Sequence, residues 1–192
     1  GVRIRIRGFR ALDKTMMNKG YHMGEDRGAT LVEAAIVLPI FFLLVFGLLE
    51  FGFGFKDWLT INHAAREGAR VSVAAADDVR ADQLALEALE KGLNGDMLSS
   101  VEFVEIGNAD GSIANQYTPD STTCGWSPCP NIDINPTFEG DVNWPPSARD
   151  VEMPDVDRII VTIRFEHDYL TGFIGDSVTW NASKVMRIEP QG

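Results

Sequence analysis

The stretch RGATLVEAAIVLPIFFLLVFGLLEFG, Arg27 to Gly52, decides the fold of this 192-residue chain. It holds sixteen consecutive uncharged residues, Ala34 to Leu49, and reaches Phe55 with Glu50 as its single interruption. A helix needs about 20 mostly apolar residues to cross the hydrocarbon core of a bilayer. A buried core helix of a soluble protein is the alternative interpretation. Because the run is apolar all round and its flanks differ strongly in charge, we favour a membrane-spanning helix.

Charge is divided unevenly about this helix. Residues 1–28 carry a net charge of +4 and the whole chain carries −11, so the remainder carries −15. Basic residues beside a membrane helix stay in the cytoplasm. We therefore expect a single-pass protein of the cytoplasmic membrane with residues 1–28 as a basic cytoplasmic leader and an acidic domain outside. Phosphate repels such a domain, so we expect no nucleic-acid partner.

An ordinary secretory signal fits this N-terminal region poorly. Such a signal has an apolar region of about 7–15 residues followed by a small-residue cleavage site. Here the apolar run is longer, and the small-residue boundary, Gly28–Ala29, precedes it. Removal of a leader at that boundary would leave the helix on the mature protein and make Glu33 its fifth residue.

This arrangement resembles the prepilins of the type IV pilus superfamily, which a membrane peptidase cuts after a glycine and whose fifth mature residue is a glutamate. The resemblance implies a cut between Gly28 and Ala29, with Glu33 as the glutamate. An unpaired carboxylate in lipid costs about a few kcal/mol. The new α-amino group of Ala29 on a neighbouring subunit would be its partner. Alternatively, Glu33 only extends its carboxylate to the membrane interface.

The segment LLEFGFGFKDWLTINHAAREGARVSVAA, Leu48 to Ala75, resembles the TadE family of the tight-adherence (Tad, Flp-type) pilus systems. Its most distinctive piece is AAREGAR, Ala64 to Arg70. The run VTWNASKVMRIE, Val178 to Glu189, is similar to the closing strand of TadE-like and TadG-like proteins. The resemblance covers about residues 27–76 and 157–189. It implies membrane lipid, other pilins or pseudopilins, a prepilin peptidase and the pilus assembly platform as partners.

The predicted helix continues past the membrane. No proline lies between Lys56 and Ala76, and apolar residues recur there near helical spacing. A transmembrane and extended helix over residues 29–76 would be about 70 Å long. Pro39 lies inside it and removes one backbone hydrogen bond, so we expect a kink or local melting there. One departure from the family pattern is Ala34, where TadE-type prepilins often carry a bulkier residue.

Three charged residues lie close together on this helix, Arg66, Glu67 and Arg70. Ordinary pairing along a helix surface explains them. The alternative is a docking patch for the outer domain or for a partner's helix. The sequence has no G-x-S-x-G, no phosphate loop and no paired-histidine metal motif, so we expect neither an enzyme nor a cofactor.

Residues 77–192 are predicted to form an extracytoplasmic α+β domain. Its helix would have Asp77 or Asp78 as the N-cap and Gly92 or Gly95 near its end.

Three segments of this domain alternate as strands and predict a small antiparallel sheet against one or two helices. They are Val101–Gly107, Arg158–Tyr169 and Ser177–Glu189.

A proline-rich segment, about 108–157, is predicted to be a loop-rich lobe. A connection of this length is too long for a linker alone, so we expect it to be ordered. Trp126, Phe138 and Trp144 either pack this lobe down or form a binding face, and we favour packing. The only cysteines, Cys124 and Cys129, are expected to form a local disulfide in an exported domain.

Metal binding has weak support in the sequence. Zinc would need more ligands than the cysteines supply. Calcium could be held among four acidic residues, but no twelve-residue loop pattern supports it. These four are Asp150, Glu152, Asp155 and Asp157.

We therefore expect a TadE-like minor pilin or pseudopilin that acts in pilus assembly and adhesion by helix packing and through an outer interaction domain. The alternative is a membrane-anchored extracytoplasmic binding or accessory protein that is never processed.

Overall fold

The structure is a computed structural model that describes residues 25–120, 124–130, 143–172 and 175–190. It divides into two units, Gly1–Val45 and Phe46–Gly192, which are described separately. Most of the predicted leader and Phe138 lie outside the described residues.

The described part of the first unit is helical and belongs to α1 (Glu25–Ala75), which has 51 residues. Nearly all of its side chains from Gly28 to Val45 are exposed to solvent, as a lipid-facing surface would be. Among the described residues, one helix, Gly28–Ala75, is long and apolar enough to cross a membrane, and its most apolar 18-residue stretch has a mean hydropathy of 2.6. α1 is helical through Pro39, so the local melting considered from the sequence is not seen. Proline removes a single ladder bond, and the neighbouring turns keep theirs.

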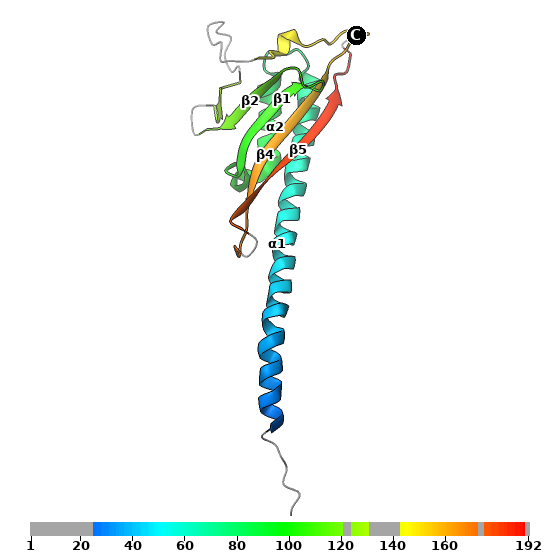
Figure 1. Cartoon of the computed structure of the whole chain (residues 1–192). Helices are drawn as coiled ribbons and strands as arrows, with labels where there is room; N and C mark the ends of the chain where they lie inside the picture. Colours follow the sequence, from blue (N-terminus) through cyan, green and yellow to red (C-terminus); the bar gives the residue numbers. More distant parts are fainter. Residues whose placement is uncertain (1–24, 121–123, 131–142, 173–174, 191–192) are drawn as a thin grey trace, which may run out of the picture. The chain divides into compact units, whose positions relative to one another are not determined.

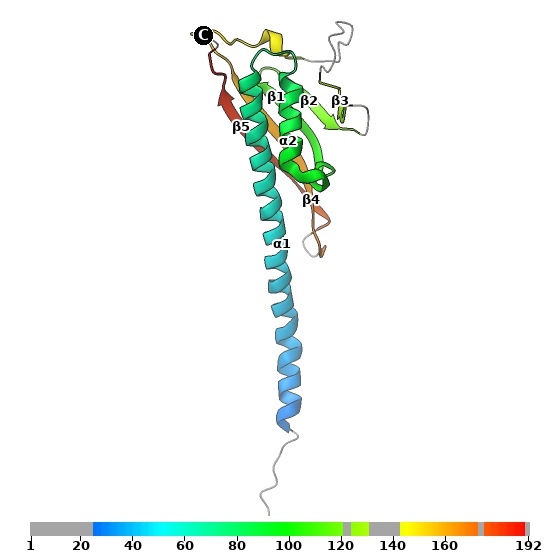
Figure 2. The ribbon, with the colours of Figure 1, turned by 180° about the vertical axis from the view of Figure 1, so that it is seen from behind.

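The second unit has two layers, in which two helices cover one face of an antiparallel sheet (Figure 2). The helices are the part of α1 from Phe46 onward and α2 (Ala81–Leu98). The strand order is β3-β2-β1-β4-β5. Figure 1 views the open face of the sheet, and Figure 2 labels β3. The strands are β1 (Val101–Asn108), β2 (Ala114–Pro119), β3 (Trp126–Ser127), β4 (Arg158–Asp168) and β5 (Ser177–Arg187). The α+β prediction is thus confirmed. Below, "the head" means α2, the sheet and their connecting segments.

Alternation along β4 shows why the strands form. Ile159, Val161, Ile163 and Phe165 are all at most 1% exposed, whereas the residues between them face away from the core. Fully burying a side chain of this size contributes roughly 1.5–3 kcal/mol. A shift by one residue would turn this whole set outward, so the pattern fixes the register against β1 and β5.

Small residues let the two helices approach closely. Ala64, Ala65 and Ala69 of α1 are fully buried, and a Cβ added to Gly92 of α2 would lie 3.1 Å from the Cα of Ala64. α2 runs through Gly92 and ends at Leu98, three residues after Gly95, so the predicted end near Gly95 is confirmed whereas Gly92 does not mark it. Gly92 serves helix packing instead of helix termination.

The predicted N-cap of α2 was also wrong. The helix begins at Ala81 after Arg80, which makes no side-chain cap. Asp78 instead closes the turn that precedes the helix. Its Oδ1 accepts the backbone N–H of Arg80 at 2.8 Å, and its carbonyl oxygen accepts the backbone N–H of Ala81. Aspartate commonly closes such a turn through its own side chain. Asp82, in the first turn of α2, is buried.

The proline-rich lobe contributes two strands that the sequence did not predict, β2 and β3. β2 buries Asn115 and Tyr117, so its inward face is partly polar and shows no apolar alternation. The packing prediction for Trp126 and Trp144 is confirmed, since they are 2% and 4% exposed.

Candidate assembly helix and its junction with the head

The residues predicted to direct processing and assembly lie on the exposed surface of α1. Gly28 and Ala29 are exposed and helical, and a Cβ on Gly28 would meet no described atom within 4 Å. Glu33 is exposed as well and forms no ion pair with any described residue. Its carboxylate is therefore accessible to a group from another molecule.

Glu50, the single charge within the apolar run, is satisfied by the head. It is 3% exposed, and its carboxylate accepts the N–H of Leu170 at 2.9 Å and that of Thr171 at 2.5 Å. The Thr171 hydroxyl donates a third bond at 2.6 Å. These residues belong to the β4–β5 hairpin loop, whose base is closed by the Tyr169 N–H on the Asp176 carbonyl. Donors to an ionised acceptor make strong hydrogen bonds, and they offset the cost of burying the charge. We call this arrangement the Glu50 clamp.

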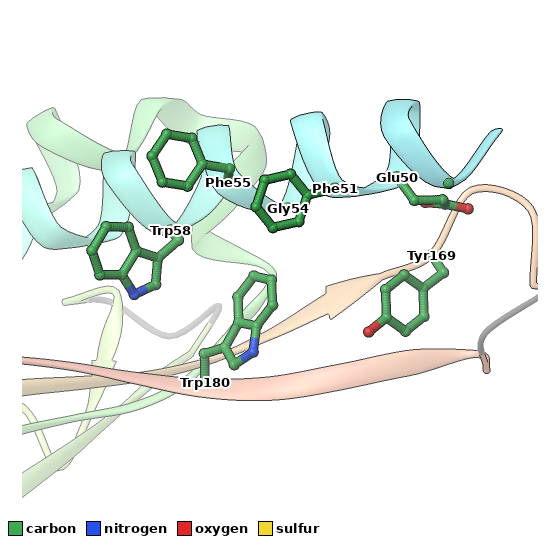
Figure 3. A pocket seen from close by; sticks show the side chains of 8 residues that line it. Glu50, Phe51, Gly54, Phe55, Trp58, Tyr169 and Trp180 are labelled. Carbon is green, nitrogen blue, oxygen red and sulfur yellow. The ribbon is translucent and has the colours of Figure 1, made fainter. Parts of the chain in front are cut away.

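An apolar groove of about 240 Å³ lies beside the clamp (Figure 3). Tyr169 and Trp180 come from the hairpin, and the other lining residues come from α1. Phe55 stacks between Phe51 and Trp58, with ring centroids 6.1 and 5.9 Å apart. The lining residues are Gly47, Glu50, Phe51, Gly54, Phe55, Trp58, Tyr169 and Trp180.

One stripe of α1 holds the hairpin at three successive points. After Glu50, Gly54 lies so close to Trp180 that an added Cβ would come within 2.9 Å of the ring. Asp57 then meets His167, with Oδ2 2.8 Å from Nδ1, and the imidazole stacks on Trp180. Positions 50, 54 and 57 follow a spacing of four and three residues, which places them on one helix face.

Sequence reasoning did not find this stripe. Glu50 and Asp57, on either side of Gly54, are spaced so that they lie on one face of the helix, and this spacing could have been noticed in the sequence. Nothing in the sequence pointed to the residues that they contact.

The charged group at Arg66, Glu67 and Arg70 shows the expected intrahelical pair. Arg70 donates to Glu67 through Nε at 3.0 Å and through a terminal nitrogen at 2.5 Å. The side chain of Arg70 is 62% exposed, and Arg66 is exposed as well. The two arginines thus point to solvent, where a partner could reach them.

The helix that carries all these features can now be compared with known families. Residues 28–70 match the family model of the TadE-like proteins. The match confirms the resemblance that was drawn from the sequence. No curated protein and no solved structure matches the chain.

The TadE-like segment begins at Gly28, contains Glu33 and Glu50, and ends at Arg70. It therefore covers the exposed apolar helix, the α1 side of the junction and the charged patch. The TadE-like family suggests a Tad pilus-associated component, a structural kind of protein. A candidate membrane-spanning helix near the N-terminus fits such a component.

Behind the TadE-like segment, a buried polar network joins α1, α2, β2 and the lobe. Arg149 pairs with Oδ1 of Asp82 and donates to the Ala76 carbonyl at the end of α1. Oδ2 of Asp82 accepts the Tyr117 hydroxyl at 2.6 Å and the Asn115 amide at 2.9 Å. Burial and the Asp82 carboxylate raise the pKa of Tyr117 well above its usual range. Both Asp82 oxygens are engaged inside the core, so the network is suited to hold the lobe, not to react.

Two further predictions concern the lobe. Cys124 and Cys129 form a disulfide, as the sequence predicted. In the proposed calcium cluster, Asp157 is used internally, because its carboxylate accepts the Asn108 amide and the Asp150 N–H. Within the described ranges, no three His, Cys, Asp or Glu side chains are grouped to hold a metal ion.

Proposed function

We propose that this protein is a minor pilin or pseudopilin-like component of a Tad-type pilus, with α1 as its assembly element and the head as its interaction domain. The observation that supports this most is that the TadE-like match begins at Gly28, where the exposed apolar surface of α1 begins. Adhesion would then depend on contacts made by the head.

Processing would prepare the helix for assembly. A prepilin peptidase would cut between Gly28 and Ala29 and free an α-amino group at the cytoplasmic end of α1. The basic leader favours that orientation, with the head outside. The mature helix would then pack beside other pilins or pseudopilins on the pilus assembly platform.

Glu33 is the carboxylate left for pairing between subunits. The segment from Gly28 to Phe55 contains two acids, Glu33 and Glu50. Glu50 accepts three hydrogen bonds from its own chain, whereas Glu33 is exposed. In lipid, helices associate through close packing and polar pairs, because the tails are as apolar as the side chains. A salt bridge from Glu33 to the Ala29 ammonium of a neighbour would satisfy both charges and set the axial register.

The proposal is tested by the N-terminus and the partners of membrane-extracted protein. Mass spectrometry should find a new N-terminus at Ala29, and Gly28→Val should abolish it. Glu33→Ala should still be processed, because it removes a charge from lipid, but should lose co-purification with pilin partners. Asp77→Ala, which removes an exposed acid just beyond the end of α1 and outside the charged patch, is the control and should keep those partners. Recovery of processed Glu33→Ala with partners at wild-type levels would refute the pairing.

The second candidate is an unprocessed, membrane-anchored accessory protein. One observation favours it: the Gly28–Ala29 bond lies inside α1, which begins at Glu25, so cleavage requires the first turn to unwind. Wild-type protein that retains residues 1–28 in cells with an active peptidase would support this candidate over the pilin.

A further inference from the structure

We propose that Leu170 and the adjoining apolar groove form a lipid-binding element in the headgroup region at the outer face of the bilayer, and that the Glu50 clamp holds them at that depth. The proposal requires only that α1 spans a bilayer, and it does not depend on the pilin role.

The number of residues needed to cross the hydrocarbon core places its outer edge next to the Glu50 clamp. A hydrocarbon core of about 30 Å takes about 20 helical residues. Counted from Gly28, where the apolar surface of α1 begins, that length ends near Gly47. Glu50 follows one turn later, and the groove residues continue from there to Trp58. The junction with the head therefore falls at the interfacial layer.

The chemistry of the junction fits that layer. Trp and Tyr are enriched where membrane meets water, because their rings are apolar and their polar atoms reach water. Trp58, Tyr169 and Trp180 line the groove together with Phe51 and Phe55 (Figure 3). Phe51 is 73% exposed and Phe55 is 49% exposed, so the α1 side of the groove presents apolar rings to its surroundings. We therefore assign lipid as the occupant of the groove.

Leu170 adds an exposed apolar side chain next to the groove and the clamp. Leu170 is 73% exposed although its backbone N–H is held by Glu50. Its side chain is thus exposed while the backbone N–H groups of Leu170 and Thr171 are both held by Glu50. The clamp also removes the penalty that an unpaired Glu50 would cause at the hydrocarbon boundary. Asp168 and Asp176 flank the loop and are exposed, so the surface suits zwitterionic better than anionic headgroups.

The test measures where two matched positions lie in a bilayer. Full-length protein is reconstituted in phosphatidylcholine vesicles with a nitroxide on Leu170→Cys or on Met153→Cys, while the native disulfide stays intact. The two residues are 73% and 65% exposed, and both are apolar. Collisional relaxation should be several-fold stronger with oxygen than with a water-soluble nickel chelate at position 170, and the ratio should be reversed at position 153.

Further variants separate the clamp and the choice of occupant. Glu50→Ala should increase nitroxide mobility at position 170 and lower its lipid exposure, and Glu50→Gln, which keeps an acceptor oxygen, should restore part of both. Equal accessibility to nickel at positions 170 and 153 would overturn the proposal. A loss of lipid exposure at position 170 as the protein-to-lipid ratio rises would also overturn it, because the groove would then bind a second copy.

Discussion

Asp82→Ala should be among the most destabilising substitutions in the head. It leaves the Arg149 guanidinium, whose side chain is 0% exposed, without its carboxylate, and it removes the acceptor of Tyr117 and Asn115. Breaking a buried ion pair by removing one partner costs about 3–5 kcal/mol. For a unit of this size, each kcal/mol lowers Tm by about 2–4 °C. A loss of about 4 kcal/mol therefore corresponds to a fall of roughly 8–16 °C in Tm.

The assay is urea unfolding of the full chain in detergent, followed by tryptophan fluorescence. Trp144 is a direct reporter, because the Arg149 guanidinium lies 4.8 Å from its ring centroid. Arg149→Met removes the other partner, and the double variant removes both charges. The double variant should be less destabilised than the two single variants added together, because neither charge is then left buried alone.

Two results would refute this reasoning. A loss below about 1 kcal/mol for Asp82→Ala would mean that the pair behaves like an exposed salt bridge. Additive effects in the double variant would mean that Asp82 and Arg149 act independently.

Three further predictions follow from the fold and the charge pattern. Because the pKa of Tyr117 is raised in the folded state, the stability that its neutral form contributes should be complete below the unfolded pKa of about 10 and should fall as pH rises above that value. Tyr117→Phe should reduce this loss of stability at alkaline pH, and an unchanged dependence on pH would contradict the burial argument. Gly92→Val should destabilise by about 1–3 kcal/mol, because its Cβ would press on Ala64, and wild-type stability in urea would show that α2 moves freely. An impermeant thiol reagent should label a reporter cysteine at Asp110 but not at Thr15 in intact cells, and the reverse pattern would refute the orientation.

Periodicity predicted the parts of the fold in which one face is apolar. β4 and β5 alternate along their length and α1 carries a long apolar run, so the long helix and much of the sheet could be predicted from the sequence; β1 was predicted as well, although its alternation is interrupted near Val101. β2 could not be predicted in this way, because its inward-facing residue Asn115 is polar and donates a hydrogen bond to the buried Asp82. The sequence could not decide between Gly92 and Gly95 as the mark of the end of α2, because a glycine that packs against another helix, as Gly92 does, looks the same in a local pattern as one at a helix end.

The junction was beyond sequence reasoning for a different reason. Glu50 and its donors are 120 and 121 residues apart, and the loop that carries the donors has no motif for holding a carboxylate. Asp57 and His167 are similarly separated, by 110 residues. Only the pairing of β4 with β5, and the packing of α1 on that pair, brings these groups together.

Because α1 supplies buried residues to the core on which the head is built, the choice of a fragment for work in solution is constrained. A recombinant product that begins at Asp77 would lack Ile61, Ala65 and Ala69, which are fully buried in the core of the second unit. The apolar surface of α2 and of the sheet that α1 normally covers would then be exposed to water, and such a product should aggregate. A product that begins at Asp57 would retain those residues and the contact with His167, while it would shed the aromatic run before them. Crystallisation or immunisation with the outer part of this protein should therefore start from a piece that carries residues 57–75 of α1.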